Sequence, residues 1–170
     1  MKTKKKISIL VLFAFLNCLN YGAFAQGMKI VSPHPDLKFK ITRCEAAGKN
    51  VIIDFLVENL SPNDVTFCMV NGEVTDIRDD EGNIYKRNNL DLFLGNIQED
   101  IFGNVKQTLP SELPLKGRIK VVGVPESAKI FKRLQFMISS PELNVNPYHR
   151  WQTGEDLMIY NIPIYREGDE

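Results

Sequence analysis

Apolar and polar residues alternate with a period of two over much of the chain after residue 36. The pattern is clearest in residues 37–41, and in residues 51–57 and 134–138 every second side chain is apolar, with Asp54 and Gln135 on the other face. A period of two predicts β-strands that bury one face. No stretch keeps the three-and-four spacing over the length that a stable helix needs.

Turn-forming residues separate these runs, as at residues 46–50, 59–63 and 79–83. The expected strands cover residues 37–42, 51–57, 65–69, 74–77, 84–85, 115–124, 130–138 and 157–165. Residues 90–112 fit either a short helix or an edge segment. About seven short strands without intervening helices predict an all-β fold, an antiparallel immunoglobulin-like β-sandwich, with a closed barrel as the alternative.

The first 25 residues have the pattern of a secretory signal peptide. Four lysines precede a short apolar run, and the segment ends with the small residues Ala23 and Ala25 at its third-last and last positions. The run is shorter than the roughly 20 residues that span a bilayer. Cleavage after Ala25 would leave Gln26 first. Lipidation at Cys18 is the less favoured route, because Asn17 replaces the small residue that normally precedes a lipidated cysteine.

These boundaries predict four parts: a signal peptide (1–25), an N-terminal segment (26–36), one β-sandwich domain (37–166) and a short tail (167–170). Four of the 21 basic residues and none of the 21 acidic residues lie in the leader, so the remainder has 17 basic and 21 acidic residues and a formal charge of −4. That charge argues against nucleic acid or an anionic membrane as a partner.

Several turn signals recur in an order that resembles a known family. They are Asn-Val-Ile-Ile-Asp-Phe-Leu-Val-Glu-Asn at 50–59, the acidic-Gly turn before Tyr85 within 74–85, Leu-Pro-Leu-Lys-Gly at 113–117 and Val-Pro-Glu-Ser-Ala at 124–128. The family consists of exported bacterial immunoglobulin-like domains of unknown function, related in fold to a secreted mycobacterial antigen. The resemblance covers about residues 37–138. It implies a sandwich and export, and it transfers no catalytic residue.

Two cysteines, Cys44 and Cys68, remain after removal of the leader. An exported protein can keep a disulfide, so the two could be bonded. Each also lies in or beside an expected strand, where a buried free thiol would serve equally well. The sequence leaves both alternatives open.

Few residues suggest chemistry. Asp76, Asp79, Asp80 and Glu81 are the weak candidates for a metal site, but their spacing does not match a calcium loop, and a solvated hairpin turn explains them as well. The two histidines, His34 and His149, do not form a zinc-binding pair. We therefore expect neither a metal nor a cofactor, and no catalytic residues.

The segment 141–154 contains Tyr148, Arg150 and Trp151, the only tryptophan. Trp151 could plug one end of the sandwich, or the three side chains could bind a ligand. The favoured hypothesis is a non-catalytic module, periplasmic or at the cell surface, that contacts a partner protein or envelope component. The alternative is a glycan-binding or small-molecule-binding module that uses this loop. An enzyme is the least supported hypothesis.

The processing site is directly testable. Mass spectrometry of the exported protein should find Gln26 at its N-terminus, because small residues precede that position. A chain that begins at a lipidated Cys18 would contradict the expected cleavage and replace the free module with a membrane-anchored one.

Overall fold

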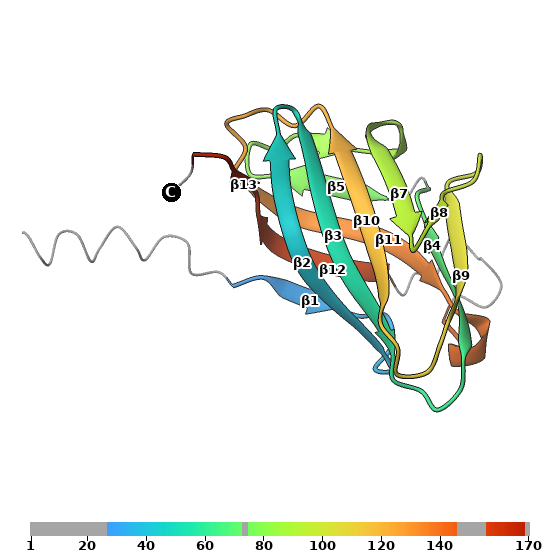
Figure 1. The fold of residues 1–170 in the computed structure, drawn as a ribbon. Helices are drawn as coiled ribbons and strands as arrows, with labels where there is room; N and C mark the ends of the chain where they lie inside the picture. Colours follow the sequence, from blue (N-terminus) through green and yellow to red (C-terminus); the bar gives the residue numbers. More distant parts are fainter. Residues whose placement is uncertain (1–26, 73–74, 146–155, 169–170) are drawn as a thin grey trace, which may run out of the picture.

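The computed structural model describes residues 27–72, 75–145 and 156–168. Two β-sheets face each other (Figure 1), and the helical elements among these residues are the single 3-10 turns η2 (Arg87–Asn89) and η3 (Pro141–Leu143). Within the described ranges, no helix has the length and apolar character that would carry it across a bilayer.

The strands in chain order are β1 (Lys29–Val31), β2 (Leu37–Ala47), β3 (Asn50–Asn59), β4 (Val65–Val70), β5 (Asp76–Asp79), β6 (Ile84–Tyr85), β7 (Leu90–Leu94), β8 (Ile97–Gln98), β9 (Asn104–Leu109), β10 (Leu115–Val122), β11 (Ile130–Ser139), β12 (Asp156–Pro163) and β13 (Tyr165–Arg166). One sheet has the order β13-β2-β3-β10-β7-β8. The other has the order β1-β12-β11-β4-β9, with β5 and β6 beside β11.

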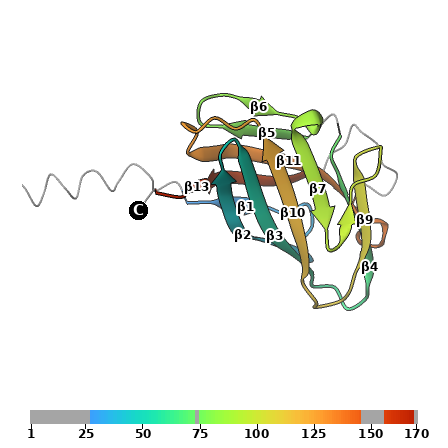
Figure 2. The ribbon, with the colours of Figure 1, turned by 45° about the horizontal axis from the view of Figure 1, so that its top comes forward.

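This strand order is that of an immunoglobulin-like sandwich. The seven sandwich positions in chain order are β2, β3, β4 with β5, β7, β10, β11 and β12. One sheet holds the first, second, fifth and fourth positions, and the other holds the third, sixth and seventh. The predicted fold class is therefore confirmed. The two sheets are separate layers, which Figure 2 shows from a second direction, so the chain does not form the alternative closed barrel.

The third sandwich position is divided between two strands. Both β4 and β5 pair antiparallel with β11, β4 with Met137–Ser139 and β5 with residues 131–135. Beyond them the sheet splits, because β9 pairs with β4 while β6 pairs with β5. The sequence pattern predicted the two strands but not that they share one position.

The hairpin of β2 and β3 shows how alternation fills the core. The apolar residues at every second position of β3, Val51 to Val57, are at most 3% exposed. The turn is tighter than predicted, because β2 continues to Ala47 and Gly48 turns the chain with φ 58°. Ile41 pairs with Phe55 and Arg43 with Asp54, which leaves Thr42 as the extra residue of a bulge.

Residues 90–112 form strands rather than a helix. β7 and β8 make a hairpin in one sheet, and β9 crosses to pair with β4 in the other. Residues 29–31, which lie in the predicted N-terminal segment, also form a strand, β1, which pairs with β12.

Gly117 has no side chain because an aromatic ring occupies that space. It pairs with Phe55 across β10 and β3, and both face the core. A Cβ added to Gly117 would lie 2.0 Å from Cζ of Phe55 and 2.4 Å from Cε2. The glycine is therefore a packing requirement of the core.

Substitution of Gly117 should destabilise the fold. Gly117→Ala forces the Phe55 ring out of its place, and overpacking of this kind costs about 1–3 kcal/mol. Urea unfolding should show a lower midpoint. The matched control is Gly27→Ala, because a Cβ at Gly27 meets no atom within 4 Å. Equal stability of the two variants would contradict the packing argument.

Candidate functional site

The sandwich is open along one edge, between β2 and β13 of one sheet and β11, β12 and the residues just before β1 on the other. A cavity of about 550 Å³ lies in this opening. We call it the edge groove; its main side chains are Met28, Ile41, Cys44, Ile130, Ile162 and Tyr165. The volume falls within the range of ordinary ligand pockets, roughly 300–1,000 Å³.

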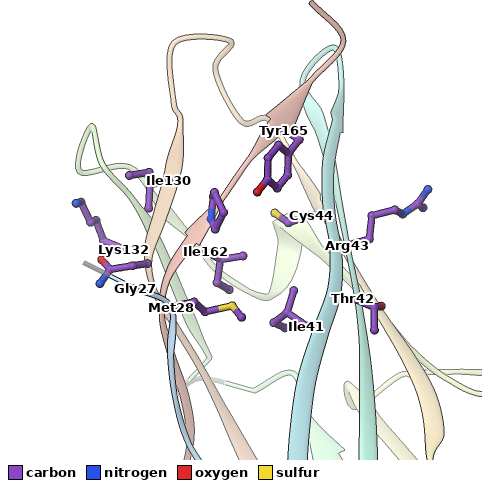
Figure 3. A pocket seen from close by; sticks show the side chains of 12 residues that line it. Gly27, Met28, Ile41, Thr42, Arg43, Cys44, Ile130, Lys132, Ile162 and Tyr165 are labelled. Carbon is purple, nitrogen blue, oxygen red and sulfur yellow. The ribbon is translucent and has the colours of Figure 1, made fainter. Parts of the chain in front are cut away.

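The interior of the edge groove is apolar. Figure 3 shows Met28, Ile41, Cys44, Ile162 and Tyr165 converging on the open space from both sheets. Thr42 and Arg43 also border the cavity, but their side chains point away, on the far side of β2. With Arg43 turned away, Lys132 is the remaining charged residue of the lining, and the other side chains that face the groove are uncharged.

An ion pair holds Arg43 away from the groove. Nε of Arg43 lies 2.8 Å from Oδ2 of Asp54. The other oxygen of this carboxylate, Oδ1, lies 2.6 Å from Nε of Arg118. Partial burial pushes the pKa of Asp54 upward, but hydrogen bonds and charge from Arg118 and Arg43 outweigh it and hold that pKa below its usual range. Asp54 therefore stays ionised and keeps both guanidinium groups on the outer face of the sheet.

Cys44 lies at the wall of the groove as an inert thiol. Burial raises its pKa to about 12, the negative charge of Glu45 adds to the shift, and Arg166 offsets part of it. A thiol with such a pKa is protonated at neutral pH and does not act as a nucleophile.

Cys44 and Cys68 are both free in the structure. Cys44 belongs to the core between the sheets, whereas Cys68 lies in a separate cluster with Val70 and Met137. Cys68 alternates along β4 with core residues, which places it on the opposite face of that sheet. Of the two alternatives that the sequence left open, the structure shows the free thiols.

The acidic cluster that the sequence offered for a metal is divided among other partners. Asp76 binds Arg78 at 2.8 Å and also Arg133. Asp80 accepts a hydrogen bond from the backbone of Lys129. Among the described residues, no three His, Cys, Asp or Glu side chains are grouped to hold a metal ion.

Asp79 organises the turn between β5 and β6. Its carboxylate accepts hydrogen bonds from the backbone N–H groups of Glu81 and Asn83, from the side chain of Asn83 and from the hydroxyl of Tyr85 at 2.7 Å. Burial pushes its pKa upward, but these four hydrogen bonds outweigh it and lower the pKa. The carboxylate therefore serves the hairpin through local hydrogen bonds. It is buried rather than solvated, since Asp79 is 3% exposed.

Ser32, His34 and Asp36, which follow β1, are the residue types of a hydrolase triad, but their hydrogen bonds are those of a turn. The hydroxyl of Ser32 donates to the carbonyl oxygen of His34 at 2.8 Å, not to the ring. Nδ1 of His34 accepts from the backbone N–H of Asp36 at 3.2 Å. A nucleophile needs its base within hydrogen-bond reach, and this geometry does not supply one.

The other predicted site residues, Tyr148, Arg150 and Trp151, lie outside the described residues, as does His149. Of the segment 141–154, the structure describes η3 and the two residues after it. Sequence reasoning missed the edge groove entirely. Its residues come from distant parts of the chain and become neighbours only through the fold.

Comparisons with known proteins identify no relative in sequence. No family model and no curated protein matches the chain. Among solved structures, a family 123 glycoside hydrolase from Clostridium perfringens matches 83% of this chain and 27% of its own, with 12% identity and a TM-score of 0.41. The PapD-like domain 7 of human CEP192 matches 82% of this chain and 91% of its own length, with 10% identity and a TM-score of 0.41.

The CooA pilin subunit of enterotoxigenic Escherichia coli matches 80% of this chain and 100% of its own, with 7% identity and a TM-score of 0.38. The chain spans about a quarter of the glycoside hydrolase, 27% of its length. With TM-scores of 0.41 or lower, none of these likenesses assigns an activity or a partner.

Asp79 gives the turn a predictable pH dependence. A lowered folded-state pKa means that the carboxylate stabilises the fold above its unfolded pKa of about 3.9, and that this stability is lost as the pH falls through the folded value. Asp79→Asn should therefore lower stability at pH 7 by about 1–3 kcal/mol, because one of the two acceptor oxygens is replaced by an NH2 group that faces other donors. It should also reduce the loss of stability below about pH 4.

Urea unfolding from pH 2 to pH 7 measures both effects. The matched control is Glu81→Gln, which removes a carboxylate from the exposed part of the same turn. If Asp79→Asn and Glu81→Gln show the same pH profile as the original chain, the role assigned to Asp79 is wrong.

Proposed function

We propose that this chain is a non-catalytic exported binding module, and that its partner is a protein that inserts apolar side chains into the edge groove. The observation that carries the proposal is the mainly apolar cavity to which both sheets contribute. Concave sites of this kind are the usual places of binding on a rigid frame. Export belongs to the proposal and rests on the leader.

The rim of the groove favours a protein partner. Met28 is 44% exposed and Tyr165 is 62% exposed, so apolar surface continues outside the cavity. Aromatic residues and methionine are enriched where proteins meet, and a central apolar contact with a polar rim is the common anatomy of such interfaces. Asn161 and Lys132 supply polar groups around this opening.

The groups near the groove support binding rather than catalysis. Cys44 is a protonated thiol, and the guanidinium of Arg43 is already paired with Asp54. Catalysis needs a nucleophile or an acid–base group that faces the substrate with a partner that activates it. The described lining of the groove contains no such pair.

Site-specific photo-crosslinking tests this function in cells that naturally produce the chain. A photoreactive residue in place of Met28, at the rim, should give a discrete adduct with a protein. The matched control is the same residue in place of Leu113, another exposed apolar residue, 62% exposed and outside the groove lining. Because only Met28 borders the cavity, we expect the adduct at that position alone.

Absence of an adduct from Met28, or equal adducts from Met28 and Leu113, would contradict the proposed site. The adduct also reports its own identity, because mass spectrometry of the crosslinked peptide distinguishes another protein from a second copy of this chain. Either identity supports a protein-binding groove.

A further inference from the structure

A second cavity, of about 880 Å³, lies on the outer face of the sheet that contains β4, β9 and β11. We call it the outer pocket. Three apolar residues form its inner end: Cys68 and Val70 of β4 and Met137 of β11. Val70 and Met137 are direct partners across the two strands. The outer face of an antiparallel sheet is ordinarily polar, so this apolar cluster departs from the usual pattern.

The apolar lining of the outer pocket runs from a dry inner end to an exposed mouth. The three residues of the inner end are at most 5% exposed. Ile97 is 46% exposed and Phe102 is 69% exposed, so these two side chains form the mouth. Ile97 belongs to β8, which lies near β9 at this edge of the sandwich (Figure 1). Cavities of this size with an apolar interior are the usual sites of small ligands.

Hydrogen bonds hold the loop at the mouth in a fixed shape. The carboxylate of Asp100 accepts from the backbone N–H groups of Phe102 at 2.8 Å and Asn104 at 2.9 Å. The guanidinium of Arg87 donates to the carbonyl oxygen of Ile101 at 2.6 Å. A site that is already ordered loses less conformational entropy when a ligand binds. The loop therefore offers a preformed wall.

Three carboxylates near the outer pocket are already engaged within the fold. Asp100 accepts the two backbone N–H groups of its own turn. Glu99 accepts from the side-chain amide of the buried Asn71 at 2.9 Å. Glu142 accepts from the backbone N–H of Thr66 at 3.0 Å and from its hydroxyl at 2.8 Å. These acidic groups therefore leave the basic side chains of the lining available to a ligand.

Two basic side chains of the lining keep free donors. Lys106 pairs with Cys68 across β9 and β4, which places both side chains on the outer face. Among the described residues, Lys106 makes no ion pair or hydrogen bond, and Arg87 uses one nitrogen on the loop. With the carboxylate of Asp100, the lining carries two positive charges and one negative charge, a net charge of +1.

We propose that the outer pocket binds a long-chain fatty acid as its anion. The hydrocarbon chain lies against Cys68, Val70 and Met137, and aliphatic side chains that include methionine adapt well to a flexible chain. The carboxylate faces the exposed cations of Lys106 and Arg87. Its single charge matches the net charge of the lining. The outer pocket shares no residue with the edge groove, so this site goes beyond the proposed function.

Isothermal titration calorimetry of the exported chain tests the site. Sodium laurate, kept below the concentration at which it forms micelles, should bind with one-to-one stoichiometry. Decanoate, which is shorter by two methylene groups, should bind roughly 15-fold more weakly, because each buried methylene contributes about fourfold in affinity. Dodecyltrimethylammonium has a chain of the same length with a positive head group, and it should show no saturable binding.

Two variants locate the ligand. Lys106→Met removes the ammonium and keeps a side chain of similar length, so laurate should bind about tenfold more weakly, the effect of a lost charge-assisted hydrogen bond. Phe102→Asp adds a negative charge at the exposed mouth and should weaken binding at least as much. Lys40→Met, the matched control, removes an exposed ammonium from β2 in the opposite sheet and should bind laurate as the original chain does.

Three outcomes would overturn the assignment. One is the absence of saturable laurate binding up to roughly 1 mM. Another is equal affinity for laurate and dodecyltrimethylammonium, which would indicate unspecific adsorption of the chain. The third is weaker binding in Lys132→Met but not in Lys106→Met, which would move the ligand to the edge groove. The photo-crosslinking result at Met28 does not depend on laurate, so the proposed function can fail or stand separately.

Discussion

The structure depends on the mutual burial of two strand faces, each of which supplies the apolar surroundings of the other. The rings of Phe39, from one sheet, and Phe67, from the other, lie 6.1 Å apart and connect the layers. Full burial of such a side chain contributes roughly 1.5–3 kcal/mol relative to exposure. Gly117 allows the ring of Phe55 to lie close to the neighbouring strand. Neither sheet could keep its shape without the other.

The same constraint leaves the edges of the sheets as the places where the molecule can make contacts. A two-layer sandwich covers its inner faces, but at an edge the layers separate and apolar side chains reach the surface. On one edge this produces a hollow between β2 and β12. On the opposite edge the chain extends beyond the sheet and displays Ile101 and Phe102. The edges of the sheets are therefore the surfaces of this molecule that are best suited to recognition.

Much of the fold is readable in the sequence because alternation is a local signal. Leu37 and Phe39 alternate with two lysines, and the structure buries that apolar face of β2. Residues 90–112 were harder to predict, although Leu90, Leu92 and Leu94 alternate as a strand should. Gly95 and Gly103 interrupt the region, and β8 has two residues, too few to carry a period.

The edge groove could not be predicted from the sequence, for a physical reason. Met28, Ile41 and Ile162 have no pattern in common along the chain, and they become neighbours because β1 and β12 face the edge of β2. The acidic run of Asp76, Asp79 and Asp80 was more conspicuous in the sequence, yet its carboxylates hold the β5–β6 region together. The acidic cluster, which is conspicuous in the sequence, stabilises the fold, whereas apolar residues that are far apart in the sequence form the cavity.

The bulge at Thr42 also protects the molecule. Along Leu37 to Cys44, β2 has a strand partner on one side only among the described residues. An unpaired strand edge of this length invites chains to stack into amyloid-like fibrils. The extra residue shifts the register between Ile41 and Arg43, so a straight incoming strand cannot match both halves of the edge. The chain can thus leave a hollow open to solvent without offering a template for uncontrolled aggregation.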